Sequence, residues 1–335
     1  VLATTARTLL DALGLAEKAT VAADADDEAS RTRAAMAALD AELGAGWVKS
    51  VTPAFAPERA VLIDDRWATA REDVARLGSG ETDLDAFRRL LAPERFVGLG
   101  QAVADHATWW AKQAKASDLA DGAERAAVLT AIAQAAPKTP QTGDATVRWS
   151  EDVAVVTGVA PGSIAAAVVG ELLAGGATVV ATSSRLTHER LEFATTLYRE
   201  HAAAGAKLWM VPANLSSYRD VDALAEWIGN DQVVTSGGST KVVKEALVPT
   251  LLFPFAAPRV SGTLADAGPA AESQTRLLLW SVERTIAALS AIGTDTHVDH
   301  RLHVVLPGSP NRGTFGGDGA YGEVKSALDA IVNRW

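Results

Sequence analysis

The second half of the chain alternates short valine-rich runs with amphipathic segments, and this alternation limits the fold more than any other feature. The first run, Val153 to Val156, is continuous and apolar, as in strands that are buried on both faces of a parallel sheet. The pattern predicts further strands at 177–182, 207–211, 250–254 and 303–306, and helices at 163–174, 188–204, 218–228, 270–292 and 321–335. This order predicts an α/β fold, a Rossmann-like, doubly wound parallel sheet with right-handed crossovers.

The part of the chain before this alternation has a different pattern. Residues 1–135 are rich in alanine, and apolar residues spaced three to four apart predict helices at 1–15, 28–43, 65–77, 83–91 and 99–114. Residues 136–148 are rich in proline, threonine and glycine and predict a linker. We therefore expect a mainly α-helical structural or scaffold region at 1–135, a linker at 136–148 and a nucleotide-binding domain at 149–335. Within that domain, residues 230–247 are predicted to be irregular.

The composition argues against several functional classes. The 335 residues carry a net charge of −10 without a basic cluster, which argues against nucleic-acid binding. There is no cysteine, so disulfides and thiolate catalysis are excluded and nothing indicates secretion. His297, His300 and His303 straddle a loop and a predicted strand and do not have metal-site spacing. No apolar run is long enough to cross a membrane and no signal peptide is visible, so we expect a cytoplasmic protein.

Small and polar residues follow every predicted strand. In a doubly wound sheet the carboxyl ends of the strands share one rim, where ligands bind. Candidate residues at the ends of all five strands, on one rim, carry more weight than any single motif. The candidates are Thr157 and Gly158 after the first strand, Ser183, Ser184 and Arg185 after the second, Asn214 after the third, Phe255, Ala256 and Ala257 after the fourth, and Ser309 after the fifth.

The turn after the first strand reads V-T-G-V-A-P-G-S-I. Gly158 lets the chain leave the strand sharply, and Gly162 lets the backbone approach a pyrophosphate at the N-terminus of the next helix. Ser163 is expected either to cap that helix or to donate to a phosphate. Such a turn alone could be only a tight connection. After the first strand of an alternating sheet, however, it predicts dinucleotide binding.

The residues after the second strand are expected to select the cofactor. NAD sites usually place an acidic residue here for the ribose 2′-hydroxyl, whereas this chain has Ser183, Ser184 and Arg185. A guanidinium with two hydroxyls suits a 2′-phosphate, so we predict NADPH. The alternative is a solvated arginine near the start of a helix. Asn214 is expected either to hold adenine or to cap the turn that follows it.

A candidate catalytic group lies near the C-terminal end. Tyr321 and Lys325 are four residues apart, so on the predicted helix they project from one face. A nearby ammonium stabilises a phenolate and makes the phenol a better proton donor. Ser309, on the preceding loop, could hydrogen-bond the same reacting oxygen. The alternative is an ordinary amphipathic pair on a surface helix.

These motifs together resemble a short-chain dehydrogenase/reductase. They are most similar to one branch of it, the β-ketoacyl reductase (ketoreductase) domain of type I multienzyme fatty acid synthases of the fungal and actinobacterial kind. The resemblance covers residues 45 to 335. It is carried by GWVKSVTPAFAPERAVLIDDRWATAREDVARL, VTGVAPGSIAAAVV, VVATSSRLT, LLFPFAAP and LPGSPNRGTFGGDGAYGEVKSALDAIVNRW.

The resemblance implies NADPH-dependent reduction of a 3-ketoacyl thioester on acyl carrier protein to the 3-hydroxyacyl form. It implies the carrier-protein domain and the other domains of the same synthase as partners, within a large homo-oligomer. Tyr321 would donate the proton, Lys325 would assist it and bind the ribose, and Ser309 would hold the ketone oxygen. The cofactor would lie on Gly158, Gly162, Ser163 and Ile164 at the phosphates, on Arg185 at the 2′-phosphate, and beside Ala256 and Ala257.

The chain departs from the family pattern at two positions. Ile164 and Ala165 stand where a third glycine is usual. The asparagine that many reductases carry on the long helix has no clear equivalent, and Ser281 lies nearest to its position. Because the chain begins at Val1 and ends within a predicted helix, we expect it to be part of a longer polypeptide, truncated at the end of the reductase domain.

Two other functions are compatible with this pattern. One is a non-catalytic scaffold module of a large assembly, and the other is a free-standing short-chain reductase acting on a small ketone. The long helical segment before the first strand argues against the second. Because carrier proteins are acidic, docking to a chain of net charge −10 needs a local basic patch, for which Lys241, Lys244 and Arg312 are the candidates. Solvated loop charges are the alternative.

Overall fold

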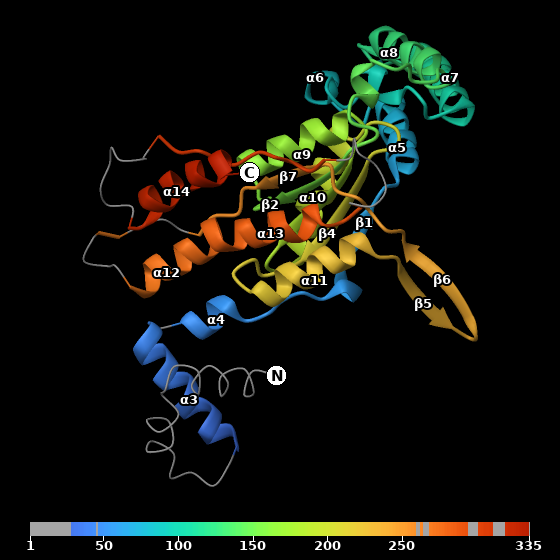
Figure 1. Cartoon of the computed structure of the whole chain (residues 1–335). Coiled ribbons are helices and arrows are strands. Elements are labelled where there is room, and N and C mark those ends of the chain that lie inside the picture. Colours follow the sequence, from blue (N-terminus) through green and yellow to red (C-terminus); the bar gives the residue numbers. More distant parts are fainter. Residues whose placement is uncertain are drawn as a thin grey trace.

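The computed structural model describes residues 28–44, 46–258, 262–263, 268–293, 301–310 and 319–334. Its centre is a six-stranded sheet in the order β1-β4-β3-β2-β7-β8 (Figure 1). The strands are β1 (Val61–Ile63), β2 (Val153–Thr157), β3 (Thr178–Ser183), β4 (Lys207–Pro212), β7 (Leu251–Pro254) and β8 (His303–Val304). All pair in parallel except β1, which runs antiparallel to β4. This confirms the predicted α/β class and the mainly parallel sheet.

The two faces of the sheet are covered by different helices. On one face, Val156 and Val179 pack with α9 (Ile164–Ala174) and α10 (His188–His201). On the other, Val155 and Val180 pack with α11 (Tyr218–Gly229) and α13 (Ser281–Ser290). Successive residues of one strand point to opposite faces, so the continuous valine run fills both cores. The direction of winding reverses between β2 and β7, which lie side by side in the middle of the sheet.

The long predicted helix at 270–292 is interrupted. It consists of α12 (Pro269–Thr275), a π-helical turn (Arg276–Trp280) and α13. The last helix, α14 (Tyr321–Arg334), packs against α12 and the π-turn. The sequence pattern gave no sign of the π-turn because its apolar residues keep the helical spacing.

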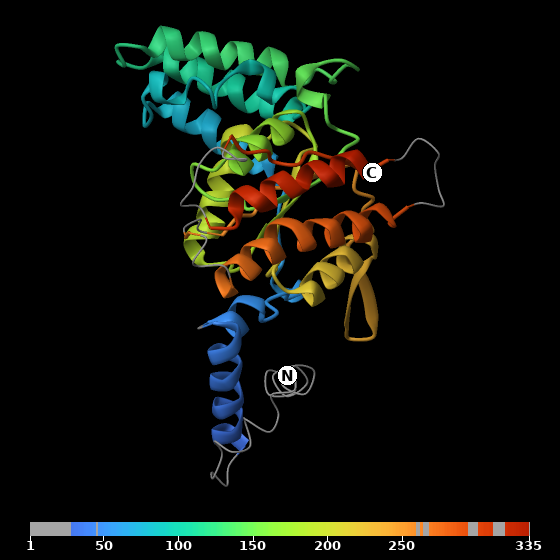
Figure 2. The ribbon, with the colours of Figure 1, turned by 60° about the vertical axis from the view of Figure 1, so that its left-hand side comes forward.

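Residues before the sheet fall into two groups of helices at opposite ends of the molecule (Figure 2). One group is α3 (Glu28–Leu43) and α4 (Trp47–Val51). The other is α5 (Arg66–Ser79), α6 (Leu84–Phe87), α7 (Gln101–Ala116) and α8 (Gly122–Ala135). The helix predicted at 83–91 is therefore much shorter, and the helix predicted at 1–15 lies outside the described residues. The division of the chain at 136–148 stays a prediction, but β1 joins residues before it to the sheet.

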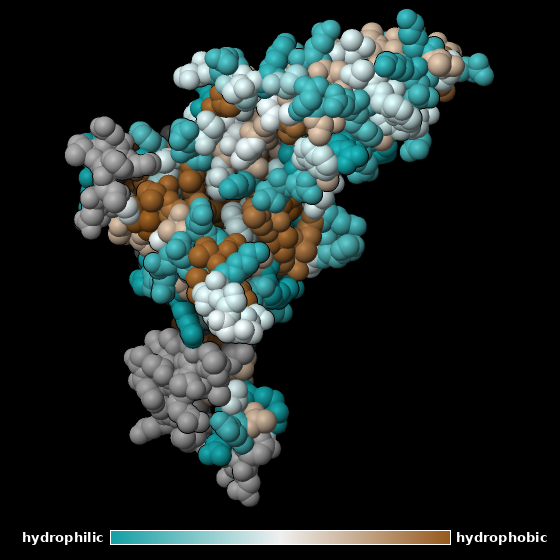
Figure 3. Space-filling model, turned by 90° about the vertical axis from the view of Figure 1, so that its right-hand side faces the viewer, coloured by the Kyte–Doolittle hydropathy of each residue, from teal (hydrophilic) through white to brown (hydrophobic). Residues whose placement is uncertain are grey.

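The segment predicted as irregular, 230–247, contains a hairpin, and that prediction was wrong. β5 (Gln232–Ser236) pairs antiparallel with β6 (Ser239–Lys244). Gly237 and Gly238 form the two-residue turn with φ of 58° and 81°, the positive values that such turns need. The hairpin projects beside α11, and its four valines are about half exposed. Figure 3 faces this side of the molecule and shows apolar patches within a hydrophilic surface.

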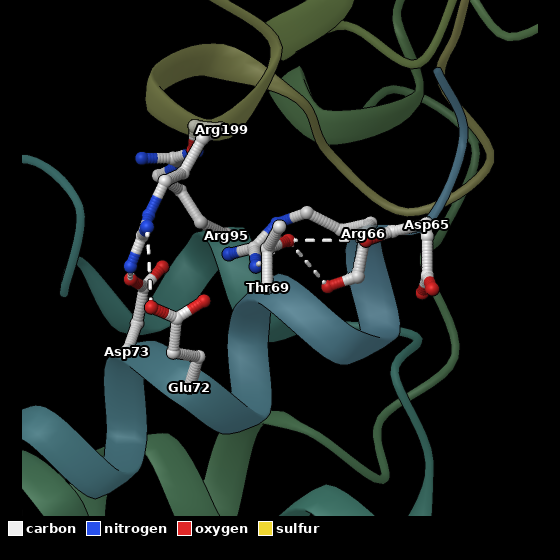
Figure 4. A network of polar contacts seen from close by, with 7 residues as sticks. All are labelled: Asp65, Arg66, Thr69, Glu72, Asp73, Arg95 and Arg199. Atoms are coloured by element: carbon white, nitrogen blue, oxygen red, sulfur yellow. Dashed lines mark hydrogen bonds and ion pairs between the residues drawn. The ribbon is translucent and has the colours of Figure 1, made fainter. Parts of the chain in front are cut away.

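A buried polar cluster joins the second group of helices to the sheet domain (Figure 4). Arg199 of α10 donates from Nε to Oδ1 of Asp73 on α5 at 3.0 Å, and Asp73 is fully buried. Burial raises the pKa of Asp73, and the Arg199 guanidinium offsets part of that rise. Arg66 donates to the carbonyl of Ala202 at 3.0 Å and Arg95 to that of Arg199 at 2.7 Å. The C-terminal end of α10 is thus bonded both to α5 and to the segment that carries Arg95.

We expect Asp73→Ala to lower the free energy of unfolding by about 3–5 kcal/mol, because it leaves Arg199 without its buried partner. Glu72→Ala is the matched control. Glu72 also contacts Arg199, at 3.5 Å, but its side chain is 57% exposed, so its loss should cost less than about 1 kcal/mol. Urea denaturation of both variants checks this, and equal losses would contradict the role given to Asp73.

Candidate functional site

The loops that follow β2 and β7 touch at the point where the winding reverses. Gly158 has φ of 76°, and a Cβ there would lie 2.7 Å from the backbone N and Cα of Ala256. Thr157 accepts a hydrogen bond on Oγ1 from the backbone N of Ala256 at 2.9 Å. Only glycine fits this contact without strain. Thr157 is therefore buried between the two strands instead of being open to a ligand.

The N-terminus of α9 faces the same rim. Ser163 is the N-cap, and its Oγ accepts from the backbone N of Ala166 at 3.1 Å and donates to the carbonyl of Ala160 at 2.7 Å. The helix-capping alternative for Ser163 is the one that the geometry shows. Gly162 has φ of 71° with open space around its Cα, and Ile164 is 77% exposed. The free N–H groups of this first turn and the helix dipole suit an anion.

A cavity of about 440 Å³ opens at this rim. Its volume is in the range of small-molecule and cofactor sites. Of the predicted residues, the cavity is lined by Gly158, Ser163, Ser183, Ser184, Asn214, Phe255, Ala256 and Ala257. Residues from the ends of β2, β3, β4 and β7 thus meet at one place, as the alternation predicted. Thr157, Gly162, Ile164, Arg185, Ser309, Tyr321 and Lys325 are not among the described lining residues.

Arg190 is a lining residue that the sequence reasoning missed. It lies in the first turns of α10, and its Nη1 donates to the carbonyl of Val159 at 3.1 Å. Arg185 does not line the cavity, and its carbonyl accepts from Ser183 Oγ at 2.9 Å. Among the described lining residues Arg190 carries the one formal charge, and none is acidic. Its position one turn into the helix after β3 was the signal that could have found it.

Asn214 uses its side chain within the protein. Its Oδ1 accepts from the backbone N of Ser216 at 3.1 Å, and its Nδ2 donates to the carbonyls of Ser50 and Thr52 at 2.7 and 2.8 Å. The turn-capping alternative is therefore the one observed. Asn214 contributes to the cavity as part of a fixed loop, because its amide hydrogens already have partners.

Tyr321 and Lys325 lie together at the start of α14. Lys325 Nζ is 5.4 Å from the centre of the Tyr321 ring, and it donates to the carbonyl of Pro307 at 2.9 Å. Burial lowers the pKa of Lys325, whose residue is only 3% exposed. Lys325 therefore ties α14 to the loop that carries Ser309. Lys325 is buried and Tyr321 is half-buried, which is unlike a solvated pair on a surface helix.

The remaining candidates have different outcomes. Ser281 is buried and donates to the carbonyl of Leu215, in the loop after β4. Lys244 was proposed for carrier docking, but it is only 4% exposed and its Nζ lies 4.8 Å from the Trp227 ring. It donates to the carbonyls of Ile228, Asn230 and Glu245 at 3.0, 3.0 and 2.8 Å. Lys244 thus anchors the hairpin and is wrong as a docking residue. Arg312, His297 and His300 lie outside the described residues.

The described residues contain no helix long and apolar enough to cross a membrane. Nor does this part of the chain hold a group of three or more His, Asp or Glu side chains that could bind a metal ion.

Several curated relatives are similar to part of this chain. The fatty acid synthase subunit alpha of Schizosaccharomyces pombe is 36% identical over 191 residues, which is 56% of this chain and 10% of that subunit. The subunit alpha of Saccharomyces cerevisiae is 35% identical over 194 residues, with the same coverage of both chains. This chain is a homologue of one segment of fungal fatty acid synthase alpha subunits. It spans about a tenth of the length of these relatives.

No protein-family model matches the chain. Similar solved structures include a 3-oxoacyl (acyl-carrier-protein) reductase from Agrobacterium tumefaciens C58 with NADP bound. It has a TM-score of 0.42 and 17% identity, with 58% of this chain and 67% of that chain covered. Another is L-sorbose reductase from Gluconobacter frateurii complexed with NADPH and L-sorbose, with a TM-score of 0.41, 19% identity and coverage of 56% and 63%. These overlaps are partial, and the fold is assigned from the chain's own sheet order.

We expect Gly158→Ala to lower the free energy of unfolding more than Gly162→Ala. Both substitutions place a side chain at positive φ, which costs about 1–2 kcal/mol. Only at Gly158 does the new Cβ also meet backbone, at 2.7 Å, which adds about 1–3 kcal/mol of overpacking. Chemical denaturation of the two variants checks this. Equal stabilities would contradict the close contact of the loops after β2 and β7.

The buried Lys244 predicts a pH dependence of stability. Burial lowers its pKa from 10.5 to about 8, so protonation costs more free energy in the folded chain than in the unfolded one. The neutral, buried Lys244 side chain carries no such cost, so its contribution to the free energy of unfolding is complete above pH 10.5. That contribution is lost as the pH falls through about 8. Relative to Lys244→Met, the wild type should gain at most about 1.4 kcal/mol per pH unit over this window. Exposed Lys241→Met should keep the wild-type slope, and a Lys244→Met variant with the same slope would refute the assignment.

Proposed function

We propose that this chain carries a ketoreductase that uses NADPH to reduce 3-ketoacyl thioesters on acyl carrier protein to 3-hydroxyacyl thioesters. It would act as one domain of a larger fatty acid synthase. The observation that carries the proposal is the cavity at the reversal point of the sheet, whose described lining residues include an arginine and no acid, in a chain homologous to synthase alpha subunits. The carrier-protein domain and the other domains of the synthase are its partners, within a large homo-oligomer.

The described residues fit a dinucleotide phosphate. The first turn of α9 offers backbone N–H groups at the cavity, beside Gly158 and Ser163. Arg190 supplies the positive charge that a 2′-phosphate requires, and Arg185, one loop away, is the second candidate. No acidic residue is among the described lining residues, so the carboxylate that usually binds the free 2′-hydroxyl of NAD is missing from this part of the wall. This charge pattern favours NADPH over NADH.

NADPH, when bound, supplies a hydride to the keto carbon. Tyr321 gives its hydroxyl proton to the ketone oxygen, and the Lys325 ammonium beside its ring stabilises the phenolate left behind. Ser309 donates a hydrogen bond to the same oxygen, which develops negative charge as the carbonyl is reduced. The Lys325 contact with the Pro307 carbonyl keeps this loop and α14 together. Holding the reactants in place supplies much of the remaining acceleration.

We expect Tyr321→Phe to lower kcat for a 3-ketoacyl thioester by about 100-fold or more, because the proton donor is lost, while NADPH still binds. Tyr218→Phe is a matched control. Tyr218 also begins a helix, but its ring packs between Arg276 and Arg284 away from the cavity, so turnover should stay normal. The assay follows NADPH absorbance under saturating substrate. Normal turnover of Tyr321→Phe would refute the assigned chemistry.

A further inference from the structure

A segment that precedes the alternating part of the chain lies against the loops that line the cavity. We call residues 46–65 the strap. It contains α4, a 3₁₀ turn (Pro57–Arg59) and the edge strand β1, and it ends at Asp65, the N-cap of α5. Its carbonyls at Ser50 and Thr52 accept both amide hydrogens of Asn214. The strap is therefore bonded to the loop after β4, whose residues 213–216 form one wall of the cavity.

Asp220 fixes this arrangement. It lies in the first turn of α11 and is 1% exposed. One oxygen, Oδ2, accepts three backbone N–H groups: Ala54 at 2.7 Å, Phe55 at 2.8 Å and Asn214 at 2.8 Å. Two of these donors belong to the strap and the third to the cavity wall. A buried carboxylate with several charge-assisted bonds is costly to replace, because its donors would lose their acceptor.

The strap also reaches the loop after β3. Arg59 Nη2 donates to the carbonyl of Leu186 at 3.3 Å, directly after the segment 183–185. Phe55 and Ala60 pack against the core between the sheet and α11. The strap thus holds, from outside, the two loops that face the adenosine end of the proposed cofactor. No described strap residue lines the cavity itself.

We propose that the strap is a positioning element of the nucleotide site and that Asp220 is the positioning residue that fixes it. This inference rests on the proposed NADPH site and assigns part of its affinity to residues that do not line the cavity. With the strap bonded, the loops after β3 and β4 are ordered before the nucleotide binds, so binding does not have to order them. Without it, the same cavity residues are present but their backbone is free to move.

The test is Asp220→Asn, with Asp222→Asn as the matched control on the same helix. Asp222 is half exposed and pairs with Arg284. In Asp220→Asn the dissociation constant and KM for NADPH should rise about tenfold, as for loss of one charge-assisted bond. The value of kcat at saturating NADPH and the KM for the ketoacyl thioester should stay unchanged. Asp222→Asn should match the wild type in all four quantities.

A second variant and a second readout distinguish failure of the strap's role from failure of the proposed NADPH function. Exposed Arg59→Ala removes the other anchor and should raise the dissociation constant for NADPH less than Asp220→Asn does. If Asp220→Asn does not fold, the dissociation constant of Arg59→Ala for NADPH tests the role of the strap. Hydrogen exchange of the nucleotide-free chain should quicken at 213–217 in Asp220→Asn, and this readout holds even if wild type binds no NADPH and the proposed function fails. Unchanged NADPH affinity and unchanged exchange in folded variants would overturn the role of the strap.

Discussion

The backbone contact between Gly158 and Ala256 is the constraint on which the rest of the site depends. Parallel pairing of β2 with β7 brings their carboxyl ends side by side, while the chain winds away from them in opposite directions. The two loops can meet only because position 158 has no Cβ and because Thr157 gives the Ala256 N–H a partner. The loop that leads from Gly158 to the first turn of α9 therefore starts at this contact.

The second level of organisation comes from residues that do not belong to the alternating pattern. The strap holds the loops after β3 and β4, and the buried Asp73–Arg199 pair holds the end of α10. Arg190 lies on this same helix and points to the cavity. The helical region and the sheet domain are therefore coupled through α10 and α11. The sequence pattern separates a scaffold region from a catalytic region, but the contacts join the two.

Periodicity predicted the sheet because short valine runs such as Val153 to Val156 alternate with amphipathic segments, as expected of strands buried between two layers of helices. It also predicted which loops meet, since the ends of parallel strands share a rim. It failed at the hairpin, where Gly237 and Gly238 were a local turn signal in a segment without strand alternation. The sequence favoured Arg185 for the 2′-phosphate and gave no indication of Arg190 or of the partners of Asn214. Those depend on long-range contacts with residues such as Ser50, which no local pattern encodes.

The most direct test of this account is a fluorescence titration of the purified chain with NADPH and, in parallel, with NADH. Because the described part of the cavity wall carries Arg190 and no acid, we expect NADPH to bind at least about tenfold more tightly than NADH, which is about 1.4 kcal/mol. Arg190→Ala should remove most of that preference while leaving NADH binding unchanged. Equal binding of both nucleotides, or binding of neither, would contradict the central claim that this rim is an NADPH site.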